Sequence, residues 1–158
     1  MNDQPTPDPT MTRIGEAVQL GRSGQKVRAR TALTALWDEI GDGGDAFHRC
    51  TLAHYLADLQ DTTEAELRWD ERALAAVSDL TDERAQRYLS SLQVRAFLPS
   101  LHLNLADCHR RLGNAARARK HLAGAREHLA HLPDDAYGEA IRAAVRDFAA
   151  DDPTDAGR

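Results

Sequence analysis

The stretch that decides the fold is residues 105–125, LADCHRRLGNAARARKHLAGA. It predicts one helix ending near Leu112, a turn at Gly113-Asn114, and a second helix. The small residues of this stretch fall where two packed helices must approach closely; they are Ala106, Ala118 and Ala125. The stretch therefore predicts an antiparallel helix pair.

Helical periodicity continues outward in both directions from this pair. We expect helices at about 11–22, 25–40, 46–60, 62–79, 114–131 and 136–149, and a long helical segment from Thr81 to Leu112. Gly41 ends the second helix and Asp45 caps the third. Asp61 with Glu64 has the spacing of a capping box. Pro99 predicts either a kink in the long segment or a break with proline in the first turn of a new helix.

The helix pairs form a repeat when they are aligned on one small residue of each second helix. Ala29 and Ala65 are 36 residues apart, and Ala118 follows after 53 more. The first interval is close to the period of about 34 residues in tetratricopeptide repeats, and the pattern resembles that family. Segments 47–60 and 100–107 are also similar to small actinobacterial tetratricopeptide-repeat proteins.

The resemblance implies an all-α fold in which antiparallel helix pairs stack as a short right-handed superhelical array. The repeats would be about 11–41, 45–80 and 82–133 within a single domain of residues 11–150, with 136–149 as a C-terminal capping helix. Residues 1–10 and 151–158 are expected to be disordered tails, because they hold prolines and polar residues with little apolar content. The alternative is a plain helical bundle with accidental alanine spacing.

Composition limits the classes of partner. The chain of 158 residues is 42% hydrophobic and carries a net charge of -5, which argues against sequence-blind binding to nucleic acid or to an anionic membrane. No apolar run is long enough to span a bilayer. Two cysteines are too few for a disulfide framework. We therefore expect a cytoplasmic protein with reduced thiols.

Tetratricopeptide arrays generally bind peptides in a concave groove that is lined by first-helix side chains. In the second predicted repeat the helical spacing selects Cys50, His54 and Asp58 for that groove. The first repeat offers a blander wall of Ile14, Val18 and Arg22. In the third repeat the same spacing selects Leu103, Asn104, Asp107 and Arg111. The pairs His54–Asp58 and Asp107–Arg111 also suit ordinary solvated i,i+4 contacts.

Metal and catalytic motifs are weak in this sequence. His128 with His131 and Cys50 with His54 have one-turn spacing, but neither pair has two further ligands at a recognisable interval. We find no phosphate loop and no nucleophile elbow. A basic cluster around the third turn lacks interleaved aromatic residues.

The sequence therefore predicts a non-catalytic protein- or peptide-binding module, with no cofactor and no metal. One alternative is a small-molecule- or metal-responsive regulatory protein that uses the same cavity. Another is a structural homo-oligomer.

Overall fold

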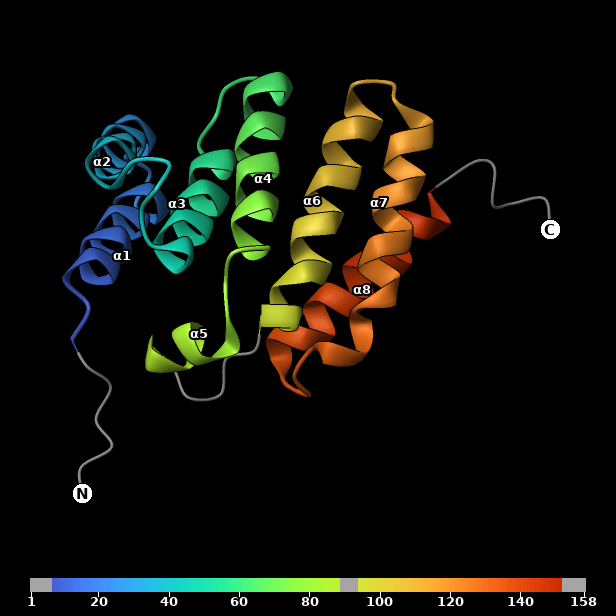
Figure 1. The fold of residues 1–158 in the computed structure, drawn as a ribbon. Helices are drawn as coiled ribbons and strands as arrows, with labels where there is room; N and C mark the ends of the chain where they lie inside the picture. Colours follow the sequence, from blue (N-terminus) through green and yellow to red (C-terminus); the bar gives the residue numbers. More distant parts are fainter. Residues whose placement is uncertain (1–6, 89–93, 152–158) are drawn as a thin grey trace. The chain divides into compact units, whose positions relative to one another are not determined.

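The computed structural model describes residues 7–88 and 94–151, and all regular structure within them is helical (Figure 1). The chain divides into two compact units, Met1–Val94 and Arg95–Arg158. The sequence-based prediction of an all-α chain is confirmed. The predicted disorder of 1–6 and 152–158 lies outside the described residues.

The first unit consists of two antiparallel helix pairs and a short fifth helix (Figure 1). Its helices are α1 (Pro9–Arg22), α2 (Lys26–Ile40), α3 (Ala46–Asp58), α4 (Thr63–Val77) and α5 (Asp82–Tyr88). Fully buried alanines occur along the paired helices, among them Ala29, Ala53 and Ala73. Because the alanine side chain is a single methyl group, the helix axes can approach closely at these points. Larger side chains fill the core beside them, including Ile14, Leu33, Leu52 and Leu56.

Side-chain caps begin most helices of the first unit. Asp45 caps α3 as expected, with its Oδ1 accepting from the backbone N–H of His48 at 3.1 Å. The prediction for α4 is wrong by one residue, because Thr62 is the cap and Asp61 instead pairs with Lys26 and Arg30 of α2. The boundary predicted for the N-terminal tail is also wrong. Helix α1 begins at Pro9, with Asp8 as its cap.

An ion cluster of Asp8, Asp45, His48 and Arg84 joins the starts of α1, α3 and α5. The guanidinium of Arg84 donates through Nε to Asp45 at 2.7 Å and through Nη2 to Asp8 at 3.3 Å, and it lies over the Phe47 ring at 5.1 Å. His48 Nε2 lies 2.8 Å from Asp8 Oδ2. Each carboxylate thus caps one helix and also pairs with a residue of another.

This cluster lowers the pKa of both carboxyl groups. Partial burial tends to raise the pKa of Asp8 and of Asp45. Hydrogen bonds from His48 to Asp8 and from Arg84 to Asp45, together with the backbone caps, outweigh that effect and hold both pKa values below 3.8. Both carboxylates are therefore ionised at neutral pH.

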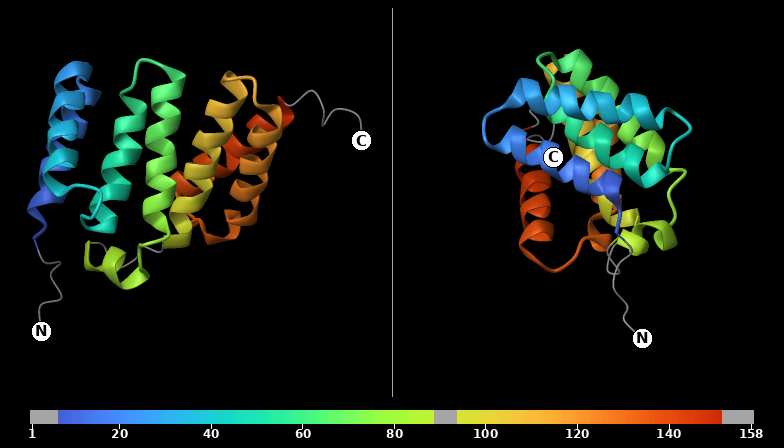
Figure 2. Two further views of the ribbon diagram at one scale, coloured as in Figure 1. Left: turned by 45° about the horizontal axis from the view of Figure 1, so that its top comes forward. Right: turned by 90° about the vertical axis from the view of Figure 1, so that its left-hand side faces the viewer.

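The second unit contains one antiparallel helix pair and a further helix packed against it (Figure 2). The pair is α6 (Leu98–Arg111) and α7 (Ala115–Glu127), followed by the short η2 (Leu129–His131) and by α8 (Ala136–Ala150). Their shared core consists of Ala106, Leu122, Ala125, Val145 and Ala149. Gly113, with φ of 79°, makes the tight turn between α6 and α7.

The predicted long segment from Thr81 to Leu112 is not one helix. Thr81 caps α5 as expected, because its Oγ1 accepts a hydrogen bond from the backbone N–H of Arg84 at 3.2 Å. A 3-10 turn, η1 (Val94–Phe97), precedes α6, and Pro99 lies in the first turn of α6. Proline is tolerated there because that N–H has no partner within the helix. Of the two alternatives for Pro99, the break is confirmed.

Two glycines are expected to respond oppositely to replacement by alanine. At Gly21 an added Cβ would meet Ala29 and Leu59 at an ordinary 3.5 Å, so Gly21→Ala should raise the free energy of unfolding by about 0.5–1 kcal/mol. At Gly113 the positive φ should make the same change destabilising by about 1–2 kcal/mol. Urea unfolding measures both. A destabilised Gly21→Ala variant would mean that α1 and α2 leave no room for a methyl group.

Arg84→Gln should lower the free energy of unfolding by about 1–3 kcal/mol at pH 7, because two partly buried carboxylates lose their cation. The pKa values of Asp8 and Asp45 lie below their ordinary value of 3.8 in the folded state, so the stabilisation by Arg84 is complete above about pH 5 and is lost as the pH falls through that ordinary value and below it. The difference in free energy of unfolding between wild type and variant should therefore decrease in acid. The control is Arg87→Gln, on the same helix. A difference that stays constant from pH 7 to about pH 3 would contradict this account.

Candidate functional site

The best candidate for a recognition groove is a pocket between the first helices of the two pairs in the first unit. Its volume is about 250 Å³. Helix α1 contributes Val18, Gly21 and Arg22. Helix α3 contributes Tyr55 and Asp58, and its C-cap residue is Leu59; Leu33 of α2 completes the lining. Gly21 lacks a side chain, which leaves space between the two helices. The pocket thus has an apolar floor, with the side chains of Arg22 and Asp58 at its edge.

Two titratable side chains near this pocket, His54 and Asp58, form the i,i+4 pair that the sequence predicted for the groove. Burial lowers the pKa of His54, and the Asp58 charge opposes that effect only in part. Burial also raises the pKa of Asp58; His54 opposes this rise and Glu66 adds to it. His54 Nδ1 is buried and has no hydrogen-bond partner within the described part of the chain. Surrounding apolar groups therefore favour the neutral forms of both side chains.

Not all of the groove residues predicted within the first compact unit line the pocket. Asp58 lines it together with Val18 and Arg22, whereas His54 is not among the lining residues. Cys50 lies in the core with 7% of its surface exposed, and burial raises the pKa of its thiol to about 12. At neutral pH Cys50 is therefore a protonated, apolar-like side chain.

The predicted residues of the second unit lie on α6. Asp107 accepts from Arg111 Nε at 2.9 Å and from Arg110 Nη2 at 3.1 Å, as one-turn contacts on a partly exposed helix face. Such contacts contribute a few tenths of a kcal/mol, about what an ordinary surface pair gives. Asn104 is half-buried one turn before Asp107.

A second cavity, of about 380 Å³, opens beside the ion cluster and is lined by Pro7, Asp8, Pro9, Thr10, Asp45, His48, Arg84 and Arg87. Its carboxylates already cap α1 and α3, and its guanidinium is already bound to both. Because these side chains already bind one another and the helix ends, the cluster has a structural role.

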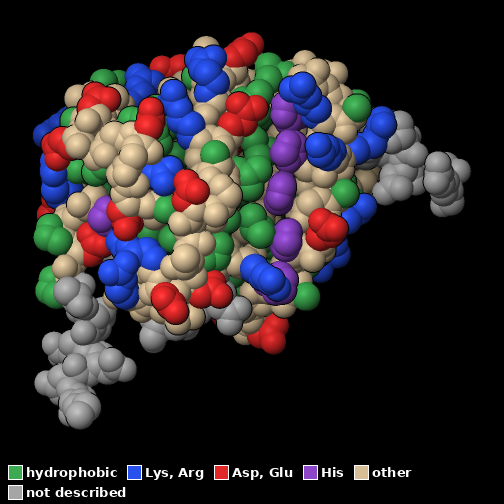
Figure 3. Space-filling model, viewed as in Figure 1, with side chains coloured by type: hydrophobic (Ala, Val, Ile, Leu, Met, Phe, Trp, Pro, Cys, Tyr) green, Lys and Arg blue, Asp and Glu red, His purple; other side chains and the backbone are tan. Residues whose placement is uncertain are grey.

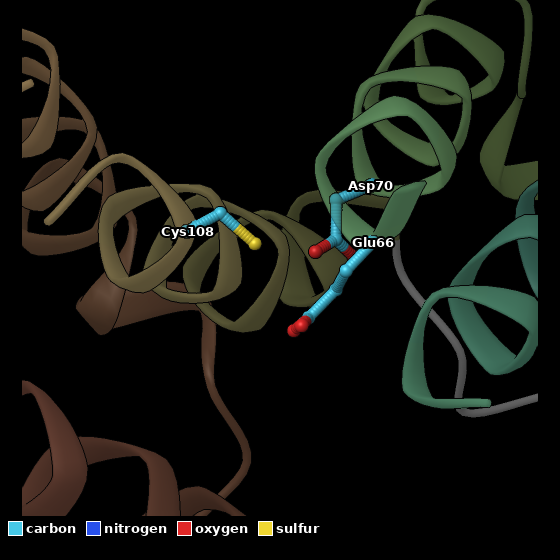
Figure 4. A group of neighbouring side chains, drawn as sticks. All are labelled: Glu66, Asp70 and Cys108. Carbon is cyan, nitrogen blue, oxygen red and sulfur yellow. The ribbon is translucent and has the colours of Figure 1, made fainter. Parts of the chain in front are cut away.

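Glu66 and Asp70 lie one turn apart on α4 in the first unit, and Cys108 lies on α6 in the second (Figure 4). Carboxylates and a thiol are metal-ligand types. Because the two helices belong to separate units, we assign these three residues no common site.

Sequence reasoning missed the grouping of five histidines on the second unit (Figure 3). It considered spacing within one helix and so found only His128 with His131 at a workable interval. The available signal was a matched spacing of seven in both helices, His102 with His109 and His121 with His128. Two turns separate each pair, so each pair lies on one helix face.

Comparisons with family models, with curated proteins and with solved structures found no match for this chain. None of the helices in the described residues is long and apolar enough to cross a membrane.

Proposed function

We propose that this chain is a non-catalytic, tetratricopeptide-like module that binds an extended segment of a partner protein in the cytoplasm. In this proposal the helix pairs α1–α2, α3–α4 and α6–α7 are repeat units and α8 is the capping helix. The first helices of the two pairs in the first unit, α1 and α3, would line the recognition surface, as first helices do in the family that the sequence resembles.

The observation that supports the proposal is the pocket between α1 and α3, the first helices of two successive pairs. Its volume of about 250 Å³ is formed by apolar side chains with Arg22 and Asp58 at the edge. Pockets for drug-sized ligands are usually about 300–1,000 Å³ and enclosed, so this open pocket better suits one apolar side chain of a peptide. Arg22 and Asp58 would then contact polar groups of the flanking peptide residues.

The small, open pocket suits a peptide better than it suits the ligand of a small-molecule-responsive regulator, the alternative function. A small ligand would need most of its surface buried. A peptide gains further contacts along the groove outside the pocket, and its affinity is concentrated in a few anchoring side chains.

A displayed library of random peptides, selected on the full chain, tests the proposal. We expect enrichment of peptides with one large apolar residue, and at least about tenfold weaker binding of these peptides to Tyr55→Ala, which removes one wall of the pocket. Fluorescence anisotropy with the selected peptides measures the affinities.

The matched control is Tyr137→Ala, because Tyr137 is a 50% exposed tyrosine in the second unit. This variant should bind the selected peptides like wild type. Peptides that bind Tyr55→Ala and wild type equally well would place recognition on another surface. A selection without enrichment would count against peptide binding.

A further inference from the structure

Five of the seven histidines form one row on the second unit (Figure 3). This histidine row consists of His102 and His109 on α6, His121 in the middle of α7, His128 as the C-cap of α7, and His131 in η2. The antiparallel arrangement of α6 and α7 brings the two heptad-spaced pairs against each other.

The central members of the row are His102 and His121. Their ring centroids are 5.4 Å apart and their Nδ1 atoms are 3.1 Å apart. The row continues on each side with nearly parallel rings. His109 lies 5.4 Å from His121 at 4°, and His128 lies 6.2 Å from His102 at 8°. A nitrogen pair on two facing helices is therefore flanked by further imidazoles.

Gly124 of α7 makes the position of His102 possible. A Cβ at residue 124 would lie 3.0 Å from both Nδ1 and Cε1 of the His102 ring, closer than ordinary van der Waals contact. The ring thus lies directly on the backbone of α7. Glycine is otherwise unfavourable within a helix by about 1 kcal/mol, so its presence here fits a need for space beside His102.

The row also contains ring nitrogens that have no hydrogen-bond partner among the described residues. The Nδ1 atoms of His109 and His128 are buried and have no hydrogen-bond partner among the described residues, and His109 is only 2% exposed. Burial and neighbouring charges lower the pKa of His102, and lower that of His121 to about 4. Neutral imidazole is the form that binds metal ions.

We propose that the histidine row binds a divalent transition-metal ion such as Zn²⁺, with His102 and His121 as its first two ligands through Nδ1. Two nitrogens bound to one tetrahedral Zn²⁺ at about 2.0–2.1 Å lie about 3.3 Å apart, close to the observed 3.1 Å. The ion would take the place of the hydrogen bond between these atoms. The ring that donates its Nδ1 proton in that bond would change tautomer and carry its proton on Nε2, so that both Nδ1 lone pairs face the ion. A ring rotation of His109 or His128 would supply the third ligand, and water would supply the fourth.

The charges around the row make a specific prediction about salt. Arg117 and Lys120 lie close enough to His121 to lower its pKa, whereas Glu127 acts on His102 in the opposite sense. The net effect of these cations is to repel a divalent ion. Because salt screens that repulsion, affinity for Zn²⁺ should increase with ionic strength, opposite to the behaviour of an acidic surface site.

Isothermal titration of the full chain with Zn²⁺ tests the site, and Co²⁺ supplies a visible absorption signature of tetrahedral nitrogen ligation. We expect one equivalent of Zn²⁺ to bind, and His102→Gln and His121→Gln each to weaken binding at least about tenfold. The control His131→Gln, at the end of the row, should change affinity less than about twofold. Absence of saturable binding up to about 1 mM Zn²⁺, or equal affinity in all three variants and wild type, would overturn the proposal.

Gly124→Ala keeps every histidine and favours the helix, so it tests the site without removing a ligand. The new methyl group must displace the His102 ring. We expect weaker Zn²⁺ binding at unchanged helicity by circular dichroism. Wild-type affinity in this variant would overturn the assignment of His102. Because the row lies in the second unit, none of these outcomes bears on peptide binding by the α1–α3 pocket.

Discussion

The close approach of paired helices at buried alanines is the constraint on which the rest of this structure depends. Ala29 and Ala73 in the first unit and Ala106 and Ala125 in the second have no exposed surface. Packed helix axes lie about 8–10 Å apart, at the short end where the contact residues are small. At that separation, side chains that flank the contact on one helix reach those on the other. The histidine row of α6 and α7 requires this spacing, because His102 and His121 meet across the pair.

The elements of this fold were largely predictable, because each depends on local sequence. Apolar periodicity located the helices, and the short polar residues before them located the caps at Asp45 and Thr81. The errors in helix starts arose where two neighbouring residues could both cap a helix, or where a residue distant in sequence holds the cap in place. Asp61 and Thr62 are both good caps, and the cations of α2 draw Asp61 away. Asp8 is held in place by Arg84, 76 residues later, a contact that no local pattern reveals.

The candidate sites were less predictable, since they depend on which helix faces are covered. Helix α3 has buried residues all around, from Phe47 and Cys50 to Leu56 and Ala57, because it packs against α1, α2 and α4. Periodicity cannot separate a groove face from a core face on such a helix, which is why Cys50 was placed in the groove. Asp58 lies at the end of α3, where that coverage stops, and it does line the pocket. For α6 and α7 the spacing of seven was visible, but the register between the helices was not.

Two histidines of this chain show how surroundings decide what one residue type can do. His48 lies against Asp8 and Asp45, so its ring completes an ion cluster of carboxylates and a guanidinium. His121 lies among other imidazoles, Arg117 and Lys120, and these neighbours and its burial favour the unprotonated ring. In the first setting a ring nitrogen contacts an anion, and in the second the ring is kept in the neutral form that has one unprotonated nitrogen. A count of seven histidines therefore carries little functional information until packing has assigned each ring its neighbours.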